Sequence, residues 1–97
     1  MKTTHRFRAP EQVGRLLAGL HPQIKRRMRA GLDLLCRDVH AGKPLRAELE
    51  GLRSLRAGRF RIVYRIATRR IIDIVAIGPR KTIYEETLRL VTKDRAG

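Results

Sequence analysis

The sequence contains few aromatic residues and only one cysteine. Of its 97 residues four are aromatic, none is tryptophan, and Cys36 has no second cysteine to pair with. So few aromatic side chains argue against a platform on which single-stranded bases stack. The lone cysteine excludes an internal disulfide, and its place beside the apolar stripe of a predicted helix indicates a half-buried packing residue. The three histidines lack cysteine or acidic neighbours at ligand spacing, so we expect no metal and no cofactor.

Long apolar runs are absent as well. No stretch is apolar enough to span a bilayer, and no predicted helix combines a basic face with an aromatic one, so a membrane partner is not expected. The N-terminal residues MKTTHRFRAP are charged and lack the apolar segment of a signal peptide, which predicts a cytoplasmic protein. At 97 residues the chain suffices for one domain, residues 1–97, with a modest core.

Acidic residues are far outnumbered by basic ones. The chain has 23 lysines and arginines against nine aspartates and glutamates, which corresponds to a formal net charge of +14. Such an excess predicts an anionic partner, namely RNA, DNA or an acidic protein. Most of the basic residues are arginines, whose guanidinium groups match phosphate oxygens in pairs. Coding bias in a GC-rich genome explains the same preference equally well.

The imbalance is greatest in residues 52–70, which contain seven arginines and no acidic residue. Alternation along 59–67 gives this segment an apolar face and a cationic face, because successive side chains of a strand point to opposite sides. The apolar set is Phe60, Ile62, Tyr64 and Ile66, and the opposite set is Arg59, Arg61, Val63 and Arg65. Since like charges on neighbouring strands repel, a face of one sign favours a polyanionic ligand.

The turn before this segment decides which residues lie beside Arg61. A two-residue turn at positions 57 and 58 would pair Ser54 with Arg61 and Arg56 with Arg59. Both Ser54 and Arg56 would then lie on the cationic face.

Periodicity predicts an α+β fold. Strands over 52–57, 59–67 and 70–77 form a three-stranded meander of two successive hairpins, and a short N-terminal strand over 3–9 completes a small antiparallel β-sheet. Helical spacing of apolar residues predicts an N-terminal two-helix hairpin over 10–20 and 22–39, which covers one face of the sheet.

A short C-terminal helix is predicted over 81–93, and three residues are expected on its buried side, namely Ile83, Leu90 and Val91. Three other apolar residues are spaced to pack under the sheet, namely Leu45, Leu49 and Leu52. The segment 70–77 is almost continuously apolar, which predicts a strand covered on both faces. Its one charged residue, Asp73, is expected to pair with an arginine or with Tyr64, because an unpaired buried carboxylate is costly.

Three residues form a candidate catalytic group. Arg61 lies mid-strand on the cationic face, Arg80 follows the turn after the next strand, and Tyr84 comes four residues later. A strand end, a turn and a helix start can meet at one rim of a sheet, where two guanidinium groups and a phenol suit phosphoryl transfer on RNA. The alternative is that the ring of Tyr84 covers the core while both arginines are solvated.

The segments KPLRAELEGLRSLRAGRFRIVYRI and IIDIVAIGPRKTIY, with the two-helix hairpin before them, resemble the RelE/ParE toxin superfamily of type II toxin-antitoxin systems. Members carry a pattern close to R-L-R-x-G-x-Y-R-x-x-Y, followed later by x-x-G-H-R-x-x-x-Y. The resemblance implies that Arg61 stabilises the transition state, that Arg80 acts on the leaving group and that Tyr84 orients the substrate base.

Three positions depart from the superfamily pattern. Leu52 and Ser54 stand where the ribosome-dependent RNases carry lysines, one of them proposed as the general base, and Pro79 stands where many relatives have histidine. Glu48, Glu50, a neighbouring arginine or the ribosome itself could supply the base instead.

The resemblance implies a toxin that cleaves mRNA on translating ribosomes, by attack of the 2′-hydroxyl on the adjacent phosphodiester and without a metal. The residues expected to contact RNA are Arg56, Arg59, Arg65, Ser54 and Lys81. Two alternatives stay open, namely a non-enzymatic inhibitor of DNA gyrase, as in ParE members, and a nucleic-acid-binding domain without activity. The resemblance also implies a cognate acidic antitoxin, which would fold across the arginines and form a hetero-oligomeric complex.

Overall fold

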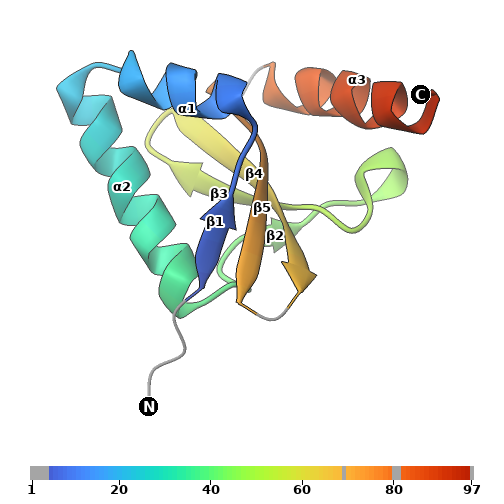
Figure 1. Ribbon diagram of the computed structural model, residues 1–97, viewed down its shortest axis with the longest axis horizontal. Coiled ribbons are helices and arrows are strands. Elements are labelled where there is room, and N and C mark those ends of the chain that lie inside the picture. The colour runs from blue at the N-terminus through green and yellow to red at the C-terminus, as the bar shows by residue number, and fades with distance from the viewer. Residues whose placement is uncertain (1–4, 69, 80–81, 97) are drawn as a thin grey trace.

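A computed structural model of the chain, which describes residues 5–68, 70–79 and 82–96, is built around one twisted five-stranded sheet (Figure 1). The strand order is β1-β5-β4-β3-β2. The strands are β1 (Arg6–Arg8), β2 (Lys43–Pro44), β3 (Arg53–Ala57), β4 (Phe60–Thr68) and β5 (Ile71–Pro79). The predicted α+β fold and its two successive hairpins are thereby confirmed.

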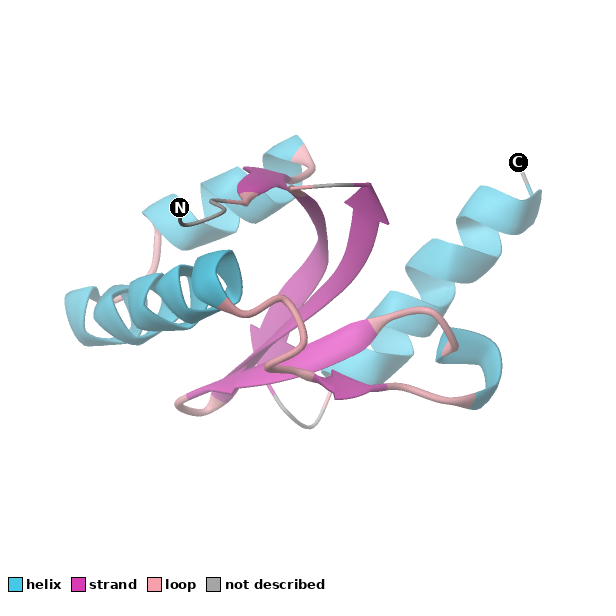
Figure 2. Ribbon diagram, turned by 90° about the horizontal axis from the view of Figure 1, so that it is seen from below, coloured by secondary structure: helices cyan, strands magenta, loops and turns pink. Residues whose placement is uncertain are grey.

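Helices cover both faces of the sheet. They are α1 (Glu11–Ala18), α2 (Pro22–Arg37) and α3 (Ile83–Ala96), and a 3₁₀ helix, η1 (Ala47–Leu49), precedes β3. The N-terminal pair lies on one side of the sheet and the C-terminal helix on the other (Figure 2). Helix α2 begins where the sequence predicts, because Pro22 suits a first helical turn and His21 accepts a hydrogen bond from the backbone N–H of Gln23 at 3.2 Å. No helix within the described ranges is long and apolar enough to cross a membrane.

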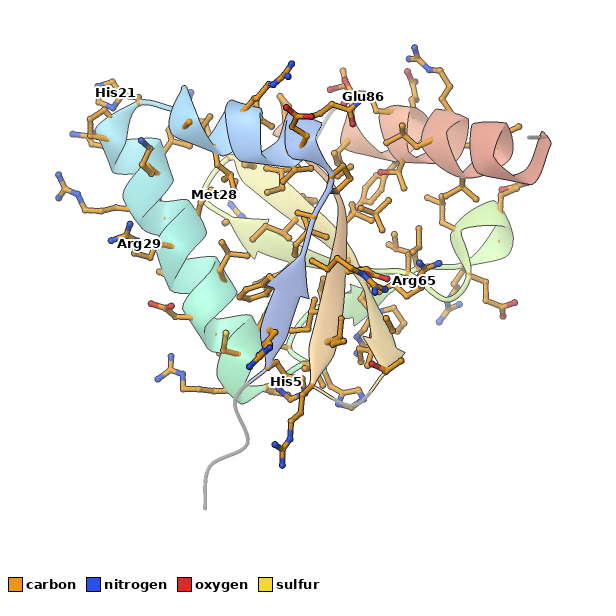
Figure 3. All side chains as sticks on the ribbon, in the orientation of Figure 1. His5, His21, Met28, Arg29, Arg65 and Glu86 are labelled. Atoms are coloured by element: carbon orange, nitrogen blue, oxygen red, sulfur yellow. The ribbon has the colours of Figure 1, made fainter. Side chains whose placement is uncertain are left out.

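The larger core, called the hairpin-face core below, lies between the sheet and the N-terminal helix pair. Its buried members are Val13, Met28, Leu35, Leu55, Ala57, Ile62, Tyr64, Ile72, Ile74 and Ile77. Figure 3 shows Met28 on the side of α2 that faces the sheet. Tyr64 is fully buried, and its hydroxyl donates to the carbonyl of Val39 at 2.7 Å and accepts from the N–H of Gly42 at 3.0 Å. The apolar face predicted for β4 is therefore correct, and the one polar group in it is satisfied.

A smaller core, called the α3-face core, lies on the opposite side of the sheet. Its buried members are Leu52, Val63, Ala76 and Ile83, and Leu45 and Leu49 pack against it. This confirms that the three leucines of the loop region pack under the sheet. Strand β5 contributes to both cores, so the prediction that it is covered on both faces is also confirmed.

The buried side of α3 differs from the prediction at one position. Leu90 is 41% exposed, whereas Thr87 is completely buried. Thr87 lies one turn after Ile83, so it faces the sheet by helical geometry, and it satisfies its hydroxyl by donating to the carbonyl of Ile83 at 2.7 Å. Because threonine is polar, the apolar periodicity of the sequence does not identify Thr87 as a buried residue.

Two details of the sheet were not expected. The N-terminal strand pairs in parallel with β5, with Arg6 opposite Ile71, so the sheet is mixed and not wholly antiparallel. Residues 3 and 4 of that predicted strand lie outside the described residues. Strand β2 adds a fifth strand beside β3, and its two residues, one of them a proline, carry no strand pattern.

The turn between β3 and β4 lies one residue later than predicted. Ala57 pairs with Phe60 and Arg56 with Arg61, so Gly58 and Arg59 form the turn. Gly58 has a φ of +65°, which a glycine at the first position of a two-residue hairpin turn adopts without strain. The later turn changes the register of the whole β3–β4 pair, so Ser54 pairs with Val63 and not with Arg61. Ser54 and Arg56 nevertheless keep the face that was predicted for them.

Candidate functional site

Arg61 is the second residue of β4, next to the β3–β4 turn, and not mid-strand as predicted. It pairs with Arg56 on one side and with Gly78 on the other. Helix α3 lies close to this point, because a Cβ atom added at Gly78 would come within 3.1 Å of Cδ1 of Ile83. Two arginines on adjacent strands therefore lie near the start of α3.

The guanidinium group of Arg61 has an unsatisfied donor. Its Nε atom is buried and has no hydrogen-bond partner among the described residues, although the side chain as a whole is half-buried. A buried donor without an acceptor costs about 1–3 kcal/mol, and more when the group is charged. An anionic oxygen placed beside Arg61 would remove that cost, so the group is suited to binding an anion.

Tyr84 is held in place by Ser54. The phenol lies 3.2 Å from Oγ of Ser54 and donates a hydrogen bond to it, and the ring packs against the α3-face core. Tyr84 is half-buried, so it combines the packing role named as the alternative above with partial access to solvent. Ser54 is only 2% exposed and its hydroxyl is already engaged by Tyr84. As placed, Ser54 orients Tyr84, and it reaches a ligand only through that residue.

Arg65 shares the carboxylate of Asp73 with Arg8. Nε and Nη2 of Arg8 lie 2.5 and 2.9 Å from the two oxygens of Asp73, and Nη2 of Arg65 lies 3.1 Å from Oδ2. The expected pairing of Asp73 with an arginine is confirmed. The hydrogen bond from Arg8 lowers the pKa of Asp73, Arg65 lowers it further, and burial opposes both. Arg65 keeps a side chain that is 57% exposed, over the middle of the sheet in Figure 3.

The remaining predicted contacts are distributed around the same end of the sheet. Arg56 and Arg59 are exposed, and Nε of Arg56 donates to the carbonyl of Gly58 at 3.3 Å. Arg80 and Lys81 lie outside the described residues. The structure therefore brings Arg61, Arg56, Ser54 and Tyr84 to one face, with Arg59 in the adjoining turn.

Sequence reasoning missed three charged residues near these groups. Arg8 reaches Asp73 from β1, and Arg27 of α2 packs on the turn at Gly58. Glu86 of α3 places Oε2 3.6 Å from the Cβ position of Gly78, which is the strand partner of Arg61. Arg27 was visible only as a basic residue off the apolar stripe of its helix. The contacts of all three are tertiary, so no local pattern identifies them.

Neither Cys36 nor the acidic residues form a metal site. Within the described part of the chain no three histidine, cysteine or acidic side chains are grouped closely enough to hold a metal ion. Cys36 is half-buried, as expected, and its thiol lies 3.6 Å from the carbonyl of His5. Burial, together with the charge of Asp33, raises the pKa of this thiol, which fits a packing role.

Comparison with known proteins identifies close similarities. Residues 11–84 match the family model described as the ParE toxin of the type II toxin-antitoxin system parDE. A chain of the RelBE2 toxin-antitoxin complex of Mycobacterium tuberculosis is 31% identical, with a TM-score of 0.69 over 79% of this chain and 99% of the other. No curated protein matches the sequence.

Two further solved structures share the fold. The archaeal RelE-RelB complex from Pyrococcus horikoshii contains a chain that is 25% identical, with a TM-score of 0.64 over 79% of this chain and 96% of the other. A mutant of the toxin RelE from E. coli in the free state is 14% identical, with a TM-score of 0.70 over 94% of this chain and 97% of the other.

Proposed function

Since the chain belongs to the ParE toxin family of type II toxin-antitoxin systems, we propose that it is a toxin which cleaves mRNA on the ribosome. The observation that carries this proposal is the buried Nε of Arg61, which has no partner among the described residues and lies on the same face of the sheet as the hydrogen-bonded Tyr84. A cation that lacks an acceptor is prepared to bind a phosphate whose charge increases during the reaction.

The proposed reaction is an internal transfer at phosphorus. The 2′-oxygen of one ribose bonds to the adjacent phosphorus atom, the bond to the 5′-oxygen of the next nucleotide breaks, and the 2′-proton leaves to a base. Arg61 stabilises the doubly charged phosphorane, because its guanidinium group can donate two hydrogen bonds to the equatorial oxygens. Tyr84 orients the base next to the cleaved bond. Arg80, by the family resemblance, protonates or holds the leaving 5′-oxygen.

Ser54 has a different role in the proposed site from the lysine of the ribosome-dependent RNases. A serine cannot act as the general base that the lysine is proposed to be, but its hydroxyl fixes the phenol of Tyr84. Proton removal then falls to another group, and Glu86 is one carboxylate that the structure places close to the strand position of Arg61.

Replacing Arg61 tests the proposal directly. Loss of one preorganised donor to the transition state is expected to lower the cleavage rate by about 100- to 1,000-fold. Induced Arg61→Ala should therefore relieve growth arrest and abolish the new RNA 5′ ends seen by sequencing. The matched control is Arg29→Ala, an exposed arginine of α2 (Figure 3), which should leave both unchanged. Full toxicity of a folded Arg61→Ala protein would contradict the assignment.

A second candidate is a non-enzymatic inhibitor of DNA gyrase. The description of the matching family as ParE favours it, as does the absence of a lysine at Ser54. This function predicts gyrase-linked DNA breaks, no mRNA cleavage and no dependence on Tyr84. Scoring DNA damage and RNA 5′ ends in one induced culture separates the two functions.

The proposed partner is an acidic antitoxin. Two of the similar structures named above are toxin-antitoxin complexes, and the net charge of +14 on this chain favours a partner of opposite charge. A segment lying across Arg56 and Arg61 would satisfy the unpartnered Nε and block the proposed site at once. High salt should weaken such a complex, and recovery from the host of no acidic partner at any salt concentration would count against it.

A further inference from the structure

A hollow of about 680 Å³ opens between the first turns of α2 and the turn that joins β3 to β4. We call it the hairpin-tip hollow. Its lining includes Ile24, Arg27, Arg56, Gly58, Arg59 and Phe60. Its size falls within the range of small-molecule sites, about 300–1,000 Å³, and suffices for one or two nucleotides.

Two arginines from different elements converge on Gly58. A Cβ atom added there would lie 2.8 Å from Cδ of Arg27 and 3.5 Å from its Nη1, so the arginine of α2 packs directly on the turn. From β3, Nε of Arg56 donates to the carbonyl of the same glycine at 3.3 Å. A Cβ atom at position 58 would push the aliphatic part of Arg27 aside, and the positive φ of this turn favours glycine as well.

The hollow has no compensating negative charge. No aspartate or glutamate is among the described residues that line it, and none of its three arginines forms an ion pair within the described part of the chain. Three like charges around one opening repel each other unless an anion lies between them. Phe60 and Ile24 are half-buried beside them and add apolar surface, which a phosphate alone does not need but a base or ribose does.

We propose that the hairpin-tip hollow binds the backbone of single-stranded RNA next to the cleaved phosphodiester, and that Arg27 contacts a phosphate there. The proposal rests on the proposed function, because Arg56 is both a wall of the hollow and the strand partner of Arg61. A strand bound at Arg61 can therefore continue past Arg56 toward α2. The hollow extends the site from the α3 face around the tip of the β-hairpin, and it explains why a basic residue of α2 packs against this turn.

The test measures RNA binding without cleavage. A fluorescent 2′-O-methyl oligoribonucleotide, which lacks the attacking hydroxyl, is titrated with the full chain at several salt concentrations. Arg27→Gln keeps the aliphatic contact with Gly58 and removes the charge. It should bind the oligonucleotide several-fold more weakly, and the slope of log affinity against log salt should decrease by about 0.7, the value for one phosphate contact with a single strand. Arg27→Lys should keep the wild-type slope.

Arg29→Gln is the matched control, since this arginine lies two residues away on α2 outside the lining of the hollow. The proposal is overturned if Arg27→Gln binds like the wild type, or if both glutamine variants lose the same affinity and slope. It is also overturned if Arg27→Gln weakens only the binding of poly-glutamate, because the hollow would then be a site for an acidic protein.

Failure of the proposed RNA site and failure of the proposed nuclease function give different results in the binding and cleavage assays. If Arg27→Gln weakens RNA binding while Arg61→Ala stays toxic, the RNA site stands and the nuclease function falls. If Arg61→Ala is inactive while Arg27→Gln binds normally, the nuclease function stands and the hollow is not part of it.

Discussion

The two faces of the sheet differ in what they bury. On the hairpin face, Leu35, Ile62 and Tyr64 have no exposed surface, and the one polar group among them is paired with the backbone. On the α3 face a small core around Ile83 is equally buried, but this face also carries the Nε of Arg61, which has no partner among the described residues, and a tyrosine-serine hydrogen bond. Most of the apolar burial that stabilises the fold therefore comes from one side.

Because the hairpin-face core supplies most of the apolar burial, the α3 face can carry charged residues. The buried Nε of Arg61, which has no acceptor among the described residues, costs folding stability, whereas the apolar residues of the opposite face contribute to it. The comparison predicts that substitutions on the hairpin face change stability more than activity, and that substitutions beside Arg61 do the reverse.

The largest effect on stability is expected on the hairpin face. Leu35→Ala should lower the free energy of unfolding by about 2–5 kcal/mol, because it leaves a cavity at a fully buried site. Urea denaturation measures the loss. Leu34→Ala is the control. Leu34 adjoins Leu35 in α2 but is 38% exposed, so its truncation should cost less than about 1 kcal/mol. Equal losses in the two variants would contradict the placement of this core.

A smaller effect is expected at Asp73 of β5. Asp73 joins β1 to β4 through Arg8 and Arg65, whose side chains are 65% and 57% exposed. Asp73→Asn should lower the free energy of unfolding at pH 7 by about 1–3 kcal/mol, since it weakens hydrogen bonds to two charged groups. Asp33→Asn, at an exposed position of α2, should change stability little.

The pH dependence of stability sharpens this test. The pKa of Asp73 is lowered in the folded chain, so the unfolded chain binds a proton at this residue first as the pH falls. Its contribution is complete above the ordinary pKa of about 3.9 and is lost as the pH falls below that value toward the lowered one. Asp73→Asn should therefore show a flatter decline of stability in acid than the wild type. An identical acid decline would mean that the ion pairs are not formed in solution.

The elements that could be predicted from sequence are those with a local pattern. Alternation along 59–67 identified the two faces of β4, and helical spacing with Pro22 placed the start of α2. A buried carboxylate needs a partner wherever it lies, so Asp73 could be expected to pair before its strand neighbours were known.

The wrong or missing details depend on tertiary contacts. The β3–β4 turn is shifted because Gly58 adopts a positive φ under the side chain of Arg27, and neither residue is near the other in sequence. Strand β2 exists only by pairing with β3, and Thr87 is buried only because α3 lies on the sheet. Three residues of the candidate site lie on the predicted face, namely Arg61, Arg56 and Tyr84. The hydrogen bond from Tyr84 to Ser54 depends on the β3–β4 register, which the sequence did not define.

The smallest effect on stability, with a large effect on activity, is expected for the Ser54–Tyr84 hydrogen bond. Ser54→Ala and Tyr84→Phe should each lower the free energy of unfolding by about 0.5–1.5 kcal/mol. The double variant should cost little more than either single one, because both substitutions remove the same bond. RNA cleavage by Ser54→Ala should fall mainly in kcat, since the ring of Tyr84 remains present but is no longer held, and Ser54→Thr should restore part of it. The matched control is Thr87→Val, which removes a buried hydroxyl from the same face, one that donates to the carbonyl of Ile83 and not to Tyr84 or Ser54, and it should leave cleavage unchanged. If Thr87→Val and Ser54→Ala reduce cleavage equally, Ser54 acts only through general packing, and the contrast between a stabilising face and a functional face is lost.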